Sequence, residues 1–379
     1  MKMRIRLLGI CILAMLQACA FDAAGEPSGK IRLDWPRDGA AVSLLTEAQK
    51  AYFATPTERR VAGFDDPEAR AKLATIGWRP APVTLVWSGT DWDRGPAVVE
   101  IRRESNGQIV RRIDMSQRTR NVCLVSNLET GTVYAWRVTV AGEVSKWGRF
   151  VTEPGSRLLD VDGVPNFRDL GGRVGLDGRR VRQGLVYRSS GANQNSTTNE
   201  FPGVDRITEK GRRTAREVLG IRTELDLRSD RECKGMCASP FGEGVRWVHV
   251  SSGCYQWITN AADRAAMAKC FRTVNDPANL PVDFHCISGQ DRTGTLAFVL
   301  NAILGVAEPE LSLDWEMTVF WNPATGWFSR KGRYEAMLKF FNGFPGPTLR
   351  EKVEAYLKTC GITQAEIESF RKLMLEEGM

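Results

Sequence analysis

Cys286 and Arg292, with five residues between them, are the residues of this sequence best placed to do chemistry. The spacing alone has little weight, because a chain with nine cysteines and frequent arginines produces such a pair by chance. Its context is informative: a β-type run, 282–285, enters the loop, Gly289 lies within it, and an apolar helical run, 293–306, follows. A strand–loop–helix turn of this kind points backbone N–H groups inward and predicts an oxyanion site.

The loop divides the chemistry among its residues. Cys286 is the predicted nucleophile, because a thiol at a helix N-terminus ionises more readily. Arg292 is the predicted phosphate ligand, since its planar guanidinium can hold two oxygens of one phosphate. The residues between them are expected to complete the phosphate-binding site: Ile287, Ser288, Gly289 and Gln290.

Hydrolysis through a cysteinyl-phosphate needs a proton donor for the leaving oxygen. Asp291 is the first candidate, because an acid inside the loop can face the leaving group. The alternative, left open, is that Asp291 only braces the loop. Thr293 is expected to hydrogen-bond the sulfur and help Cys286 leave in the second step, and His285 is expected to brace the loop.

Three segments together resemble the bacterial atypical tyrosine and phosphoinositide phosphatases. They are Asn-Phe-Arg-Asp-Leu-Gly-Gly at 166–172, Gly-Ile-Arg-Thr-Glu-Leu-Asp-Leu-Arg-Ser at 220–229, and His-Cys-Ile-Ser-Gly-Gln-Asp-Arg-Thr-Gly at 285–294. They occur in the family's order, and the resemblance extends over residues 160–379.

The resemblance implies Cys286 as nucleophile, Arg292 as phosphate ligand and Asp291 as general acid. One position departs from the family pattern. Gln290 stands where the family usually has Lys, a residue linked to binding extra phosphates on inositol lipids. The departure weakens the case for multiply phosphorylated substrates and leaves the core chemistry intact.

The other charged residues of these motifs are supporting candidates: Arg168, Asp169, Asp226 and Arg228. Two interpretations stay open. Either Arg168 or Asp226 lines the pocket, or the four form a network that holds the strand ends and the loop. Three tryptophans of this half are expected to lie in the core rather than to form a substrate platform: Trp247, Trp257 and Trp315.

The chain begins with a basic stretch and an apolar run, 7–16, too short to span a bilayer. The run Leu16-Gln-Ala-Cys19 resembles the lipobox of bacterial lipoproteins, whose cysteine is lipidated. We therefore predict a signal peptide over 1–18, lipidation of Cys19 and a tether over 19–30. The protein is expected in the periplasm, attached to the outer membrane through this lipid. A plain secretory signal peptide is the alternative, and it also predicts export.

The composition of the chain limits the kinds of partner and cofactor that we expect. The formal net charge of +7 includes three basic residues of the leader, so the exported chain is too mildly basic to predict nucleic-acid binding. With only two histidines, no metal and no cofactor are expected. Export makes disulfides possible, and at least one is expected among three cysteines of a loop-rich stretch: Cys233, Cys237 and Cys254.

The chain divides into two predicted domains. Alternating apolar residues predict short strands over 31–154, a β-sandwich that resembles fibronectin type III domains, with a helical insertion at 44–75. Beyond a linker at 153–156, strands alternate with helices. Residues 160–379 are therefore expected to form an α/β domain with a largely parallel central sheet flanked by helices.

The function most strongly indicated is a cysteine-dependent phosphatase that hydrolyses phosphomonoesters such as phosphotyrosine. A phosphoinositide or small-molecule phosphatase is one alternative. Sulfur or arsenate chemistry, and a docking protein that binds phosphate without turnover, are others. The expected partners are a phosphorylated protein or other phosphoester, and a protein docked on the β-sandwich.

Overall fold

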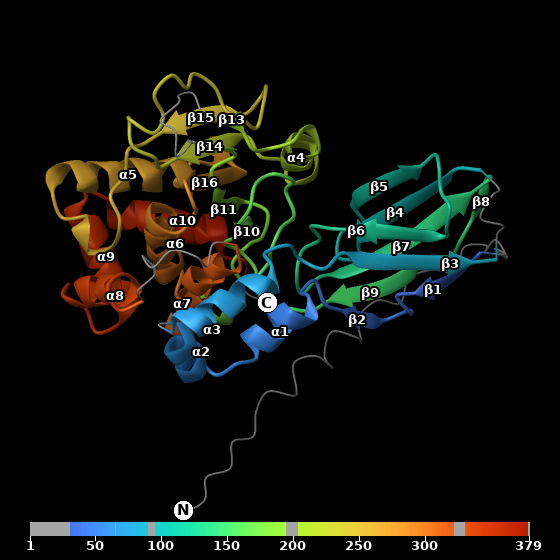
Figure 1. Ribbon diagram of the computed structural model, residues 1–379, viewed down its shortest axis with the longest axis horizontal. Helices are drawn as coiled ribbons and strands as arrows, with labels where there is room; N and C mark the ends of the chain where they lie inside the picture. The colour runs from blue at the N-terminus through green and yellow to red at the C-terminus, as the bar shows by residue number, and fades with distance from the viewer. Residues whose placement is uncertain (1–30, 65, 90–94, 195–203, 322–329, 378–379) are drawn as a thin grey trace, which may run out of the picture.

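The computed structural model describes residues 31–377, except for 65, 90–94, 195–203 and 322–329. Figure 1 shows two lobes, with the N-terminal strands on one side and a sheet flanked by helices on the other. The predicted signal peptide and Cys19 lie outside the described residues. No helix in the described part of the chain is both long and apolar enough to cross a membrane.

The N-terminal lobe contains two sheets. Their facing strands alternate buried and partly exposed residues, as Val83, Leu85 and Trp87 illustrate, and they share one apolar cluster. One sheet has the strand order β1 (Arg32–Trp35), β3 (Val83–Ser88), β6 (Val122–Val125). The other has the order β2 (Ala40–Val42), β9 (Gly148–Thr152), β7 (Val133–Val140), β4 (Ala97–Arg103), β5 (Ile109–Met115), with β8 (Glu143–Val144) on β7. The likeness to fibronectin type III domains stays a prediction.

The helical insertion packs on the C-terminal half of the chain. It forms α1 (Glu47–Phe53), α2 (Thr57–Phe64) and α3 (Pro67–Leu73), followed by a 3-10 turn at Ala74–Ile76. The rings of Tyr52 and Phe53 lie 5.1 and 6.1 Å from that of Phe320 in the C-terminal half. Tyr52 therefore belongs to the core of the α/β lobe, and Figure 1 shows the three helices against that lobe rather than over the sandwich.

The C-terminal lobe has a five-stranded sheet in the order β10 (Arg168–Asp169), β11 (Val186–Ser190), β16 (Val282–Cys286), β14 (Thr223–Asp226), β15 (Arg246–His249). The last four strands are parallel and only β10 is antiparallel, so the sheet is largely parallel, as predicted. A small hairpin pairs β12 (Asn193–Gln194) with β13 (Val204–Asp205).

Helices cover both faces of this sheet (Figure 1). One face packs against a large apolar core formed by α5 (Ala261–Asn275), α6 (Asp291–Ile303), α7 (Glu308–Glu316), α8 (Tyr334–Asn342), α9 (Leu349–Thr359) and α10 (Gln364–Met374). The other face packs against a second apolar cluster that includes Ala215 of the π-helical turn Thr214–Val218, which directly follows α4 (Glu209–Arg213). Short 3-10 turns lie at Leu176–Gly178, Tyr255–Trp257, Pro277–Asn279 and Met317–Phe320. The mixed α/β architecture places β16, with Cys286 at its end, in the middle of the sheet.

Candidate active site

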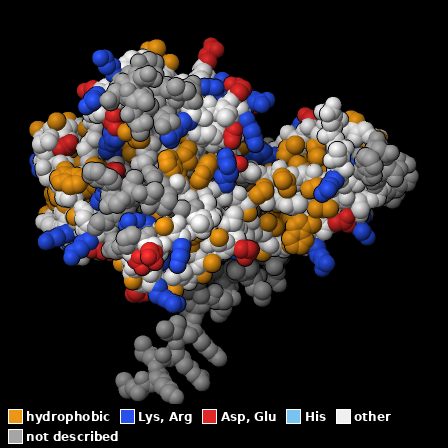
Figure 2. Space-filling view, in the orientation of Figure 1, with side chains coloured by type: hydrophobic (Ala, Val, Ile, Leu, Met, Phe, Trp, Pro, Cys, Tyr) orange, Lys and Arg blue, Asp and Glu red, His pale blue; other side chains and the backbone are white. Residues whose placement is uncertain are grey.

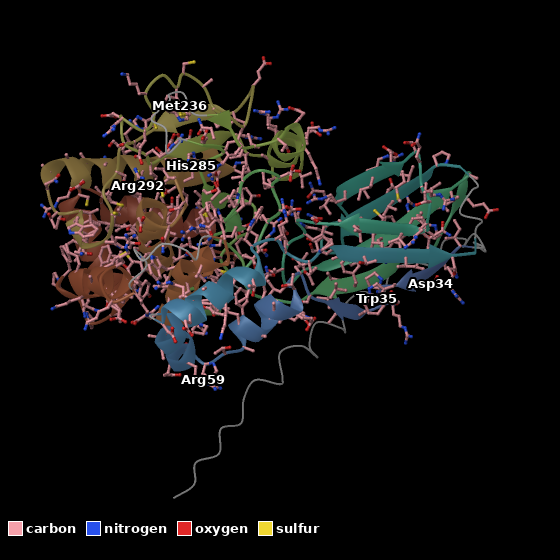
Figure 3. The ribbon with its side chains drawn as sticks, viewed as in Figure 1. Asp34, Trp35, Arg59, Met236, His285 and Arg292 are labelled. Carbon is pink, nitrogen blue, oxygen red and sulfur yellow. The ribbon has the colours of Figure 1, made fainter. Side chains whose placement is uncertain are left out.

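The loop between β16 and α6 carries the predicted chemistry. Cys286 ends the central strand and is 1% exposed, while α6 begins at Asp291. The carboxyl edge of a parallel sheet is where α/β proteins generally bind ligands, and here it meets the N-terminus of a helix. Figure 3 labels His285 and Arg292, which lie on the strand side and the helix side of this loop.

The loop conformation requires glycine at one position. Gly289 has φ +69°, and a Cβ there would lie 2.3 Å from the carbonyl oxygen of Ser189. Side chains from outside the loop hold its carbonyl oxygens: Asn166 Nδ2 donates to Ser288 O (2.9 Å) and Arg188 Nη2 to Gly289 O (2.5 Å). With these carbonyls engaged by the protein body, the loop can turn its N–H groups toward an anion.

Behind the loop, three buried arginines converge on one carboxylate. Asp314 accepts hydrogen bonds from Arg168 Nε (3.1 Å) and Arg173 Nη2 (2.8 Å), and it also contacts Arg188. Burial favours the neutral acid, but the three guanidinium groups outweigh it and hold the pKa of Asp314 well below its usual range. Arg168 is 1% exposed and also contacts Asn166, so it belongs to a network that braces the loop rather than to the pocket wall.

The surroundings of the predicted nucleophile, Cys286, favour its ionisation. Burial disfavours a thiolate at Cys286. The charge of Arg292 and the polar groups of Thr293 outweigh burial, and Asp291 opposes them. The hydrogen bond expected from the Thr293 hydroxyl to the sulfur is not formed among the described residues. The pKa of Cys286 therefore lies below the ordinary thiol value, which favours the reactive thiolate.

Arg292 is held by a residue that the sequence analysis did not identify. Its Nη1 and Nη2 donate to the two carboxylate oxygens of Glu232, at 2.6 and 3.1 Å. Burial raises the pKa of Glu232, but this pair and bonds from Ser229 lower it to about 2. The pair orients the guanidinium and leaves its Nε and remaining N–H donors for a phosphate.

Asp291 makes two contacts that the sequence did not indicate. The hydroxyl of Tyr255 donates to its Oδ1 at 2.6 Å, and Arg333 forms an ion pair with the same oxygen. Tyr255 and Arg333 come from segments 36 and 42 residues away along the chain, so no local spacing marks them. Asp291 lies at the first position of α6, next to Arg292.

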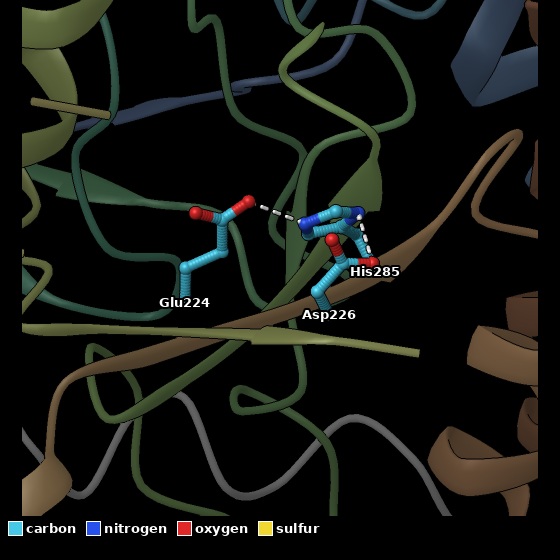
Figure 4. Close-up of side chains that lie close together, drawn as sticks. All are labelled: Glu224, Asp226 and His285. Carbon is cyan, nitrogen blue, oxygen red and sulfur yellow. Dashed lines mark hydrogen bonds and ion pairs between the residues drawn. The ribbon is translucent and has the colours of Figure 1, made fainter. Parts of the chain in front are cut away.

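His285, the residue before Cys286, lies between two carboxylates (Figure 4). Its Nε2 is 2.6 Å from Glu224 Oε1, and its Nδ1 is 3.1 Å from Cys286 O and 4.0 Å from Asp226 Oδ1. Burial opposes a charge on the ring, but Asp226 and Glu224 raise the pKa of His285 to about 9. The three buried side chains therefore form an ionic cluster behind Cys286.

The remaining supporting candidates take different places. Asp226, a member of this cluster, also pairs with Arg228 (2.6 Å). Asp169 lies apart from the loop, where it accepts from the N–H of Gly171 (2.8 Å) and from Arg157 (2.8 Å). Gln290 is 2% exposed, and its amide nitrogen has no hydrogen-bond partner among the described residues.

Two expectations are wrong. Trp257 is 58% exposed, whereas Trp315 is buried and Trp247 half-buried, because the 3-10 turn at Tyr255–Trp257 directs Trp257 outward. The seven cysteines of the described residues are all free thiols, so the disulfide expected among Cys233, Cys237 and Cys254 is not formed. The Cys233 thiol instead donates to Asp226 (3.3 Å).

The C-terminal lobe is similar to known proteins. A model described as "Tyrosine phosphatase family" matches residues 159–376. A "putative tyrosine-protein phosphatase" of Cupriavidus necator is 31% identical over an alignment of 183 residues, and the match covers 41% of this chain and 61% of that protein. The chain thus spans about three fifths of the length of this curated relative.

Two solved structures were also found. The core catalytic domain of the PP-IP phosphatase SIW14 from S. cerevisiae, in complex with citrate, is 18% identical, covers 40% of this chain and 77% of that chain, and has a TM-score of 0.26. A structure of the Siw14 catalytic core is 14% identical, with coverages of 45% and 90% and a TM-score of 0.28. These scores are too low to carry an argument. The family match extends over more than half of the sequence, and the chain belongs to the tyrosine phosphatase family.

Proposed function

We propose that this protein is a cysteine-dependent phosphatase that hydrolyses phosphomonoesters through a cysteinyl-phosphate. The observation that carries the proposal is the single loop that joins an acidified thiol, Cys286, to an oriented guanidinium, Arg292. Membership of the tyrosine phosphatase family supports it. In this loop the same positive field binds the dianion and stabilises the thiolate.

The reaction proceeds in two steps. The Cys286 thiolate attacks phosphorus, the S–P bond forms, and the P–O bond to the leaving group breaks while Asp291 protonates that oxygen. Water then attacks phosphorus, the S–P bond breaks, and Asp291 takes the proton from the water. Arg292 and the loop N–H groups stabilise charge on the phosphoryl oxygens in both steps. We assign Thr293 to stabilise the departing thiolate.

The substrate we favour is a monophosphate ester with an apolar or aromatic alcohol, such as phosphotyrosine. Gln290 adds no cation to the loop for a second phosphate. Ile287 in the loop is 41% exposed, and the exposed Trp257 packs its ring 6.1 Å from that of Tyr255, which contacts Asp291. These apolar surfaces suit an organic alcohol better than a polyphosphorylated headgroup. Phosphoinositides and small phosphate esters are the alternative substrates.

The test is phosphate release by the purified chain from a phosphotyrosine peptide, a phosphoserine peptide and an inositol-lipid panel, without added metal and under reducing conditions. Release should fall by roughly a thousandfold or more in Cys286→Ser. The buried Cys270→Ser should keep it, since Cys270 lies away from the loop in α5. No release from any substrate would favour the docking alternative. Thiocyanate formed from thiosulfate and cyanide would favour sulfur chemistry.

We also propose that the protein is an exported lipoprotein attached through Cys19 to the outer membrane, with a fibronectin type III-like sandwich that docks a partner. The lipobox-like run and the alternating strands support this. In Figure 2 the Lys and Arg side chains are scattered over the visible face and do not gather in one patch. This distribution gives no support for nucleic acid as the partner. Cys19→Ala should move the protein from the membrane to the soluble fraction, whereas Cys11→Ala should not.

A further inference from the structure

Tyr255 adopts a backbone conformation that a bulky residue rarely takes. Its φ is +55°, in the left-handed region, and its side chain is fully buried. Such a conformation is strained and persists only where the surroundings enforce it. None of the reaction steps above assigns a role to this residue, so the strain needs another explanation.

The surroundings that enforce it belong to the first turn of α6. The backbone N–H of Tyr255 donates to Thr295 Oγ1 at 2.8 Å, and the Thr295 hydroxyl donates to the carbonyl of Asp291 at 2.9 Å. The phenolic hydroxyl reaches the same turn from its other end and donates to Asp291 Oδ1 at 2.6 Å. Trp315 Nε1 donates to this hydroxyl at 3.1 Å, so its proton is directed at the carboxylate.

Arg333 completes the arrangement. Its guanidinium lies 5.8 Å from the centre of the Tyr255 ring and forms an ion pair with Asp291 Oδ1. Tyr255 and Arg333 both contact Oδ1 of Asp291. A proton that Asp291 transfers must therefore reside on its other oxygen, Oδ2. The two contacts therefore fix which carboxyl oxygen can donate and the direction in which it points.

We propose that Tyr255 is a positioning residue that orients Asp291 for proton transfer to the leaving oxygen. The inference rests on the proposed function and deepens it. In the step concerned, the proton passes from Asp291 Oδ2 to the leaving oxygen as the P–O bond breaks, and Tyr255 keeps its own proton throughout. Orientation matters because general acid catalysis needs the donor within hydrogen-bond reach of the oxygen that receives the proton.

The role predicts a dependence on the leaving group. A p-nitrophenolate leaves readily without protonation, whereas a phenolate leaves poorly and gains more from an acid. Tyr255→Phe in the full chain should lower kcat about 10-fold with phenyl phosphate and about 2-fold or less with p-nitrophenyl phosphate. Asp291→Asn should show the same selectivity with a larger loss. The double variant should lose little more than Asp291→Asn alone, because Tyr255 acts through Asp291.

Tyr356→Phe is the matched control. Tyr356 is also buried, and its hydroxyl donates to Ile258 O at 3.3 Å, away from Asp291. Its loss should leave the ratio of the two rates unchanged. If Tyr255→Phe does not fold, Thr295→Val removes the hydroxyl that accepts the Tyr255 N–H at nearly constant volume, and the same selectivity is expected.

Equal losses on both esters in Tyr255→Phe or Thr295→Val, or additive losses in the double variant, would overturn the inference. Equal losses in Asp291→Asn would overturn both this inference and the acid assignment, while leaving the Cys286 mechanism intact. Phosphate release that survives Cys286→Ser would instead refute the proposed function itself.

Discussion

At the scale of single residues, each charged side chain of the candidate site forms an ion pair with a residue of opposite charge. Arg292 has Glu232, Asp291 has Arg333, and His285 has Glu224, and each pair joins segments far apart in the sequence. A guanidinium held by two carboxylate oxygens loses rotational freedom before the substrate arrives. The side-chain entropy of Arg292 is thereby lost when the protein folds and not when the substrate binds.

Replacing Glu232 by Gln should lower kcat/KM about 10-fold and weaken inhibition by inorganic phosphate, because the bidentate pair that aligns Arg292 is lost. Steady-state rates with p-nitrophenyl phosphate give both quantities. Glu366→Gln breaks an exposed pair with Arg272 (2.7 Å) far from the loop and should change neither. Unaltered phosphate inhibition in Glu232→Gln would contradict the orienting role.

The buried His285 makes stability depend on pH. Its pKa is raised to about 9 in the folded protein, so its contribution is complete below the unfolded value of about 6.5 and is lost as pH rises through 9. Glu224 and Asp226 favour the charge, whereas Arg228 opposes it. The loss is on the order of 3 kcal/mol.

Urea unfolding at pH 6.5 and 9.5 measures this contribution. The difference in unfolding free energy between the two pH values should shrink in His285→Gln and persist in His249→Asn, which removes the other histidine. Asp283, whose pKa burial raises to about 7, adds a loss of the same sign mainly at lower pH. An unchanged difference in His285→Gln would contradict the assignment.

At the scale of elements, the strand–loop–helix unit is the part that admits least change. Gly289→Ala would place a Cβ 2.3 Å from Ser189 O at a φ of +69°, so the loop must move. The variant should lose phosphate release by about 100-fold or more and lower the melting temperature.

Gly107→Ala provides the comparison. Gly107 has nearly the same φ, +68°, but a Cβ there meets nothing within 4 Å. It should cost about 1 kcal/mol from backbone strain and leave the rate unchanged. Equal activities in the two variants would show that the loop tolerates displacement.

At the scale of the whole molecule, the N-terminal helices are part of the catalytic lobe. Arg60 on α2 donates to the buried Glu316 at 2.9 Å, and Tyr52 on α1 donates to it at 3.1 Å. Arg330 contacts its second oxygen at 2.8 Å. Glu316 lies on α7 two residues beyond Asp314, the carboxylate that anchors the arginines behind the loop. The helices α1 and α2 therefore support the α7 segment that carries Asp314.

Removing this support should be costly. Arg60→Gln leaves Glu316 buried with one guanidinium fewer and should destabilise the protein by about 3 kcal/mol in urea unfolding. Arg79→Gln, which breaks exposed pairs with Asp160 and Asp162, should cost less than about 1 kcal/mol. The coupling would be contradicted if the two lobes unfolded in separate transitions and Arg60→Gln left the transition of the C-terminal lobe unchanged.

Most elements could be predicted because their patterns are local. The strands of both lobes show alternation or continuous apolar runs, and α6 is apolar on every side because it is buried. Helix α5 was not predicted, since alanines and charged residues between its few large apolar positions blur the 3.6-residue period. The insertion was predicted as helical, but its packing on the other lobe depends on rings such as Tyr52 that meet Phe320 only in three dimensions.

The sequence alone predicts the loop chemistry, because Cys286, Asp291 and Arg292 lie within seven consecutive residues whose strand–loop–helix context is local. The tertiary structure alone decided what holds each of them: Glu232 on Arg292, Tyr255 and Arg333 on Asp291, and the arginine cluster behind Gly289. Those partners come from separate segments, and no spacing along the chain records which side chains folding brings into contact. Hydrogen bonds and ion pairs act over a few ångströms, so they are specified by packing rather than by sequence distance.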